Sequence, residues 1–106
     1  MAVYRIYDGA VTKLAGITFD GIRKTIGGYV EPVYSADGKT TLWCNEDGKP
    51  MGLPKNGLAS ALWWHINPAA NGQYLLGPIV VTGGNPDDIQ EVPAEVAVLL
   101  DEWRNP

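Results

Sequence analysis

Charged and amide side chains that could bind a ligand are concentrated in one short segment of the chain, residues 45–56. Lys49 and Lys55 could neutralise an anionic group, and a helix that begins after Asn56 would add free backbone N–H groups near them. The amide of Asn45 offers donors and an acceptor together, which suits recognition of a ligand edge. Because apolar residues flank this segment on both sides, we expect a fixed binding loop.

Carboxylates near the same segment allow a second interpretation. Glu46 and Asp47 are adjacent, and Glu31 would lie on a neighbouring strand. Acid–base catalysis or metal binding would require them to converge. The alternative is that Asp47 and Gly48 simply form a turn. Because no nucleophile or base with an orienting partner is evident, and His65 is the only histidine, we expect neither catalysis nor a metal site.

Two adjacent tryptophans, Trp63 and Trp64, follow the polar segment. On a helix they would project about 100° apart, so they cannot both face one narrow core. One of them would then be available for stacking on a ligand or for a subunit contact. Tryptophan is enriched at interface hot spots, and we therefore expect a homo-oligomer.

Composition limits the classes of function. The chain has 106 residues, a formal net charge of −4 and eight basic residues that form no cluster, and this composition disfavours nucleic-acid binding. The single cysteine, Cys44, permits no internal disulfide and is expected as a small buried side chain in a strand. Neither a signal peptide nor an apolar run long enough for a membrane span is present, which indicates the cytoplasm. The length predicts one domain, residues 1–106.

Apolar periodicity and turn residues predict an α+β domain. Strands are expected over residues 3–7, 29–34, 40–44 and 75–81, and the Asp37-Gly38 and Asp47-Gly48 pairs would make a three-stranded meander that ends near Met51. Pro78 argues for an edge or a bend in the fourth strand, and residues 82–86 read as a sharp exit. Helices are expected after Thr18, after Asn56 and after Pro93. The predicted fold is therefore a small, mostly antiparallel sheet of about four to five strands with two to three helices packed on one face.

Several motifs, taken in order, carry a resemblance to a known family. They are Ile-Gly-Gly-Tyr-Val-Glu at 26–31, the segment from Leu42 to Asn56, Ala59-Ser60, and Ile-Val-Val-Thr-Gly-Gly at 79–84. This combination resembles a family of short domains of unknown function that are encoded largely by bacteriophages, plasmids and other mobile elements. That family often has an arginine directly after the asparagine and a threonine shortly beyond, where this chain has Gly57 and Ser60. If the arginine binds a ligand in the family, Lys55 or Lys49 would replace it here.

The resemblance implies a phage or mobile-element origin and no established activity. Together with the polar segment, it suggests a non-enzymatic accessory protein of the host cytoplasm that binds a small anionic, nucleotide-derived signal of host defence. No cofactor is expected. The alternatives are a module that binds a host or phage protein, and a small hydrolase that uses Glu46 and Asp47. The predicted ligand-binding residues are Glu31, Asn45, Glu46, Lys49, Lys55 and Asn56, with Trp63 and Trp64 for stacking or a subunit interface.

Overall fold

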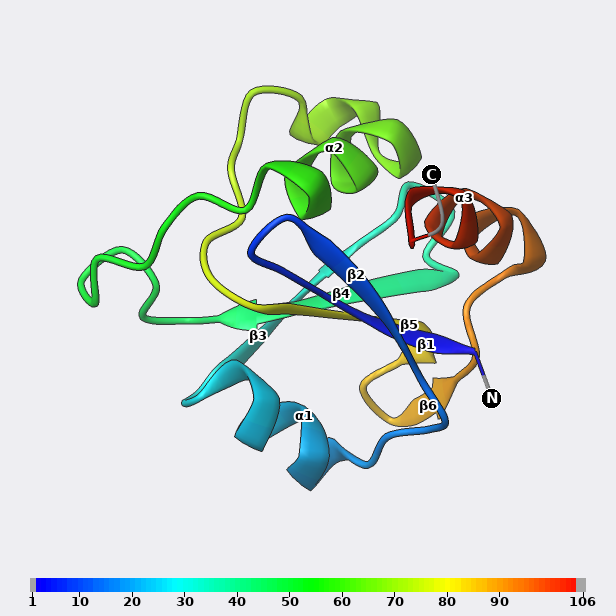
Figure 1. The fold of residues 1–106 in the computed structure, drawn as a ribbon, viewed down its shortest axis with the longest axis horizontal. Helices are drawn as coiled ribbons and strands as arrows, with labels where there is room; N and C mark the ends of the chain where they lie inside the picture. Colours follow the sequence, from blue (N-terminus) through cyan, green and yellow to red (C-terminus); the bar gives the residue numbers. More distant parts are fainter. Residues whose placement is uncertain (1, 105–106) are drawn as a thin grey trace.

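The computed structural model describes residues 2–104, which form a six-stranded antiparallel sheet with a helical layer on each side (Figure 1). The α+β class and the mostly antiparallel sheet are therefore confirmed. The strands are β1 (Val3–Tyr7), β2 (Ala10–Leu14), β3 (Val30–Tyr34), β4 (Thr40–Asn45), β5 (Ile79–Asn85) and β6 (Asp88–Gln90). The helices are α1 (Phe19–Ile26), α2 (Gly57–Ile66), α3 (Ala94–Arg104) and the short 3-10 helix η1 (Pro68–Ala70).

Strand β5 occupies the centre of the sheet rather than an edge. The strand order is β2-β1-β5-β4-β3, and β6 also pairs with β5. The expected strand over residues 75–81 begins only at Ile79, and it runs on to Asn85. Pro78 precedes the strand, so its missing N–H removes no hydrogen bond from the ladder. The prediction of an edge strand is therefore wrong, whereas the predicted bend is present at Gly77, which has φ of 74°.

The two glycines in β5 permit a close approach of the backbone rather than a sharp exit. A Cβ atom added to Gly83 would overlap the carbonyl group of Glu91, and one added to Gly84 would overlap the carbonyl oxygen of Asp88. Residues 82–85 of the expected sharp exit therefore continue the strand, and the chain turns only at residues 86–87, between β5 and β6. Glycine is required there because β6 and the residues after it pack directly on the β5 backbone.

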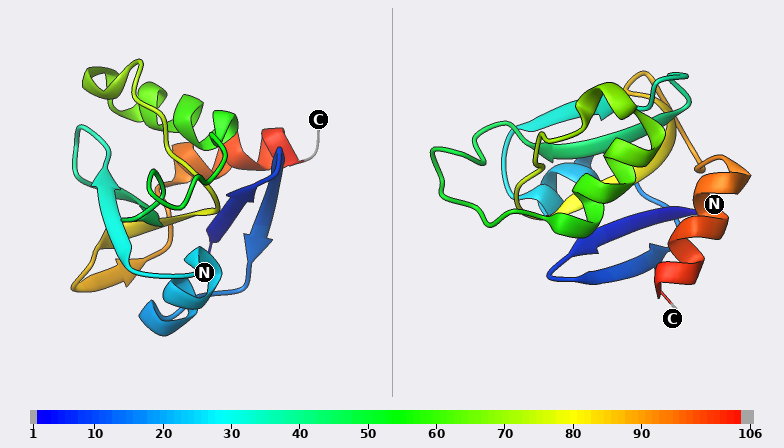
Figure 2. Two further views of the ribbon diagram at one scale, coloured as in Figure 1. Left: turned by 90° about the vertical axis from the view of Figure 1, so that its left-hand side faces the viewer. Right: turned by 90° about the horizontal axis from the view of Figure 1, so that it is seen from above.

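The helices do not share one face of the sheet, as the sequence had suggested. Leu42 and Val81 belong to the core cluster beneath α2 and α3, whereas Trp43 and Val80 pack against the buried residues of α1. Figures 1 and 2 show α1 on the opposite side of the sheet from α2 and α3. Successive strand residues point to opposite faces, so an apolar run such as β4, which is buried throughout, requires cover on both sides.

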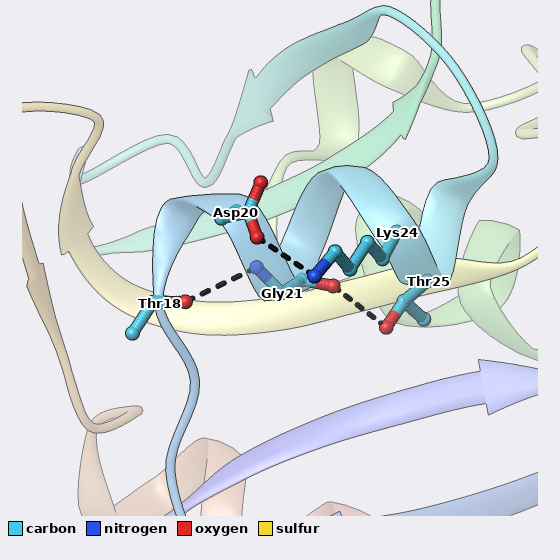
Figure 3. A network of polar contacts seen from close by, with 5 residues as sticks. All are labelled: Thr18, Asp20, Gly21, Lys24 and Thr25. Atoms are coloured by element: carbon cyan, nitrogen blue, oxygen red, sulfur yellow. Dashed lines mark hydrogen bonds and ion pairs between the residues drawn. The ribbon is translucent and has the colours of Figure 1, made fainter.

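Helix α1 is defined by local contacts, of which the cap at Thr18 was expected from the sequence (Figure 3). The Thr18 hydroxyl accepts a hydrogen bond from the Gly21 N–H at 3.1 Å and so caps the first turn. Lys24 forms an ion pair with Asp20 at 3.1 Å, one turn apart. The helix ends at Gly27, which adopts the left-handed conformation with φ of 85°.

The expected three-stranded meander is only partly correct. The first hairpin joins β3 to β4 through a turn in which Gly38 has φ of 72°. After β4, however, residues 46–52 form successive turns, and no returning strand follows before Lys55. Backbone hydrogen bonds from Met51 to Asp47 (2.9 Å) and from Leu53 to Gly48 (3.0 Å) coil this segment on itself. We call residues 46–55 the β4–α2 loop.

Candidate functional site

A recess of about 790 Å³ lies where β3 begins, β4 ends and the β4–α2 loop follows. Its floor comes from these strands, and its walls come from the loop, from α2 and from the segment before β5. The lining residues are Glu31, Val33, Cys44, Asn45, Glu46, Gly48, Lys49, Pro50, Lys55, Trp63, Gly72, Gln73, Tyr74, Leu75 and Leu76. All of the predicted ligand-binding residues except Asn56 are therefore brought together here, and Trp63 joins them.

The floor of the recess follows from strand register. Glu31 lies opposite Cys44 in the ladder between β3 and β4, and Glu46 follows two residues later. Side chains two residues apart on a strand share one face, so Cys44 and Glu46 project to the same side. The exposed carboxylates of Glu31 and Glu46 thus border a floor whose centre is the buried thiol.

Cys44 is a buried residue of β4 whose thiol is hydrogen-bonded within the chain. Its thiol donates a hydrogen bond to the Glu31 carbonyl oxygen at 3.2 Å. Burial, and to a smaller degree the negative charge of Glu31, raise the pKa of the thiol to about 12. The thiolate that nucleophilic chemistry requires is therefore scarce at neutral pH, as expected for a small buried side chain.

The Asn45 side chain shapes the start of the β4–α2 loop. Its Oδ1 accepts a hydrogen bond from the Asp47 N–H at 2.8 Å, and its Nδ2 donates to the Ile26 carbonyl oxygen at 3.5 Å. The first contact forms the local turn that asparagine favours. Asn45 thereby joins the loop to the end of α1, and its amide is engaged within the chain. Asp47 does not line the recess, so the two adjacent carboxylates do not converge there.

The far end of the loop is fixed by Asn56. Its Oδ1 accepts from the Ala59 N–H at 3.1 Å, which caps α2, while Nδ2 donates to the carbonyl oxygens of Ile6 and Gly77 at 2.8 and 2.9 Å. Asn56 lines a separate cavity of about 300 Å³ instead of the main recess. Asn56 is therefore the N-cap of α2, and the helix expected after this residue is confirmed.

Ser60 is a buried polar residue that links α2 to the segment before β5. Its hydroxyl donates to the Asn56 carbonyl oxygen at 2.7 Å and accepts from the Leu75 N–H at 2.9 Å. The motif around Asn56 and Ser60 thus has a structural basis in the wall of the recess.

The two tryptophans have different surroundings. Trp63 lines the recess, and its Nε1–H donates to the Tyr34 carbonyl oxygen at 3.3 Å. Trp64 points elsewhere and donates to the Gln73 carbonyl oxygen at 2.7 Å, with its ring edge-on to Tyr74 at a centroid distance of 5.2 Å. Both indoles are half-buried. Trp63 is therefore placed to contact a ligand. Trp64 instead contacts Gln73 and Tyr74, which form another wall of the recess.

Tyr74 and Gln73 are site residues that sequence reasoning missed. The Lys55 ammonium lies 4.4 Å from the centroid of the Tyr74 ring, a cation–π contact, and Lys55 also forms an antiparallel bridge with Leu76. The only local feature that marks residues 73–76 in the sequence is a glycine on each side, Gly72 and Gly77. These glycines indicate a loop, but they do not indicate which residues the loop contacts.

The recess carries charges of both signs. Lys49 and Lys55 lie on the loop side, and Glu31 and Glu46 border the floor. Within residues 2–104, the ion pairs are Lys24 with Asp20 and Arg104 with Asp101, neither of which lies at the recess. The same residues contain no group of three or more His, Cys, Asp or Glu side chains placed to hold a metal ion. None of their helices has the length and apolar character to cross a membrane.

Fold and site together define a small α+β domain with a recess of mixed charge at one end of strands β3 and β4. The chain belongs to the family described as Domain of unknown function (DUF3846), whose model matches residues 1–104. The resemblance to a family of unknown function is thereby confirmed. Neither a curated protein nor a solved structure matches the chain.

Proposed function

We propose that this protein is a non-enzymatic binding protein that holds a small anionic, nucleotide-derived ligand in the recess. One observation carries the proposal: a single recess gathers Lys49, Lys55 and Trp63 from the loop and α2. Its volume lies within the range of roughly 300–1,000 Å³ that is typical of small-molecule sites. The lysines would neutralise a phosphate, and an aromatic wall would contact a base.

The walls of the recess are fixed by specific contacts, which supports binding without a large rearrangement. Asn45 and Asn56 hold the two ends of the β4–α2 loop, and Trp64 holds the segment at 73–74. A site whose walls are already ordered loses less conformational freedom when a ligand enters. We expect micromolar or tighter affinity for a suitable ligand.

A role in countering host defence is the biological setting we propose. It rests on the resemblance to domains encoded by phages and other mobile elements, and it would consist of sequestering a signal nucleotide in the host cytoplasm. Homo-oligomerisation remains a prediction, which rests on the adjacent tryptophans Trp63 and Trp64. Because both indoles form hydrogen bonds within the chain, this prediction does not gain support from their placement.

Isothermal titration calorimetry with a panel of cyclic, linear and ADP-ribose-type nucleotides tests the proposal. The Lys49→Gln/Lys55→Gln double variant should bind at least 10-fold more weakly, because two charges near the phosphate are lost. Lys39→Gln is the matched control, since Lys39 lies in the β3–β4 turn, at the other end of β4 from the recess. A panel without a single micromolar binder would remove the proposal.

A second candidate is a module that binds a host or phage protein, and the exposed apolar side chains of Met51 and Tyr29 favour it. Met51, in the β4–α2 loop, is 55% exposed, and Tyr29, next to the loop's start, is 72% exposed. Affinity capture from infected cells with the wild-type chain and a Met51→Ser/Tyr29→Ser variant distinguishes this role. A partner retained by both would contradict it.

The remaining alternative is a small hydrolase that uses Glu46 and Asp47. It would be contradicted if nucleotides of the panel bind but none of them is hydrolysed.

A further inference from the structure

The balance of charge in the recess restricts what ligand fits it. Lys49 and Lys55 would hold an anion, but Glu31 and Glu46 would repel it. A ligand that is anionic throughout, such as pyrophosphate, would leave both carboxylates facing negative charge. A ligand that has an anionic end and a hydrogen-bond-donating end would satisfy all four side chains.

The two carboxylates lie near each other on the floor. Glu31 pairs with Cys44, and the Glu46 N–H extends the ladder by donating to the Tyr29 carbonyl oxygen at 2.9 Å. Glu31 and Glu46 are thus diagonal neighbours on one face of the sheet. Residues in such diagonal positions on adjacent strands lie roughly 7–8 Å apart. The influence of the Glu31 charge on the Cys44 thiol is consistent with a carboxylate that lies over the floor. An ionised carboxylate accepts hydrogen bonds and donates none.

Flat side chains stand beside these carboxylates. Trp63 and Tyr74 line the same recess, and the Tyr74 ring contacts both Trp64 and the Lys55 ammonium. Protein sites that recognise unpaired bases combine stacking on aromatic rings with hydrogen bonds to a base edge. The recess therefore offers an aromatic wall, acceptors for a base edge and cations for a phosphate.

We infer that the recess selects a guanine nucleotide, with Glu31 and Glu46 as the residues that determine base specificity. Guanine presents two adjacent donors on its Watson–Crick edge, N1–H and the 2-amino group, which match the two oxygens of one carboxylate. Adenine and uracil offer no such pair. This inference rests on the proposed nucleotide-binding function and adds the identity of the base to it.

Calorimetry with GMP, IMP and AMP provides the test, because IMP differs from GMP only by lacking the 2-amino group. GMP should bind about 10-fold more tightly than IMP or AMP, in line with the discrimination that a bidentate contact provides. In Glu31→Gln/Glu46→Gln the ratio of GMP to IMP affinity should fall close to one. The two single variants then show which carboxylate binds the base edge.

Glu95→Gln/Glu102→Gln on α3 is the matched control, since it removes two exposed carboxylates away from the recess, and it should leave the ratio unchanged. Equal affinity for GMP, IMP and AMP would overturn the inference while leaving the proposed function intact. A preference for GMP that survives in Glu31→Gln/Glu46→Gln would overturn the assignment of these residues. If no nucleotide binds at all, the proposed function fails together with the inference.

Discussion

Tyr4 connects the central sheet to the last helix through one buried hydroxyl. The side chain is fully buried in β1, and its Oη–H donates to the Asp101 carboxylate on α3 at 2.9 Å. Burial first, and then the hydrogen bond to Asp101, raise the pKa of Tyr4 to about 12. The same hydrogen bond lowers the pKa of the Asp101 carboxyl group.

The stability of the protein should therefore fall in alkaline solution through Tyr4. In the unfolded chain a tyrosine ionises near pH 10, so the stabilising contribution of the neutral folded form is complete below that pH and is lost as the pH rises toward 12. Tyr4→Phe should cost about 1–2 kcal/mol at pH 7, since the Asp101 carboxylate loses its donor. Urea unfolding at pH 7, 9 and 11 measures both effects.

The difference in unfolding free energy between the wild type and Tyr4→Phe should shrink toward the alkaline end of that series. Tyr29→Phe is a suitable control, because Tyr29 is 72% exposed and should leave stability nearly unchanged. A wild-type advantage that stays constant up to pH 11 would contradict the role assigned to the Tyr4 hydroxyl.

At the scale of elements, the central strand β5 depends on glycine for its packing. Gly83→Ala should destabilise the fold by more than about 2 kcal/mol, because the new Cβ would overlap the Glu91 carbonyl group. Gly57→Ala at the first position of α2 is the matched control: no atom lies within 4 Å of its added Cβ. Alanine there should be neutral or stabilising by up to about 1 kcal/mol. Thermal unfolding of both variants, monitored by circular dichroism, measures this difference. Equal shifts of the unfolding midpoint in Gly83→Ala and Gly57→Ala would contradict the role assigned to Gly83.

The wall of the recess formed by residues 73–76 depends on helix α2. Trp64→Phe keeps most of the apolar contact but removes the Nε1–H that donates to the Gln73 carbonyl oxygen at 2.7 Å. Ligand affinity should fall several-fold because this wall becomes less ordered before binding. Amide hydrogen exchange at residues 73–76 should accelerate in parallel. Unchanged exchange in Trp64→Phe would show that the segment is held by other contacts.

At the scale of the whole molecule, elements set by neighbouring residues were predictable, and elements set by distant ones were not. The caps at Thr18 and Asn56 and the hairpin at Asp37-Gly38 depend on side chains within a few positions, and the structure confirms them. Strand β2 was not predicted. The strand expected over residues 3–7 continues into it through a hairpin turn at Asp8 and Gly9, both of which have positive φ. Helix α1 covers the second face of the sheet through contacts with Trp43 and Val80, which no local pattern reveals.

The same distinction applies to the recess. Its residues between Asn45 and Lys55 are contiguous in sequence, and their polarity and turn residues identified them as a candidate site. Gln73 and Tyr74 reach the recess only because Trp64 and Lys55, more than eight positions earlier, contact them. Side chains such as Asn56 can be polar for structural reasons alone, and the sequence does not separate a buried cap from a ligand contact.

Chemical-shift mapping of the isotope-labelled protein with a bound nucleotide tests the central claim most directly. If the recess is the binding site, addition of GMP should shift the backbone amides of residues 44–50 and 72–76 and the indole N–H of Trp63, and leave residues 36–39 at the other end of β4 unperturbed. Shifts confined to another surface, or none at millimolar nucleotide, would show that the recess does not bind this class of ligand.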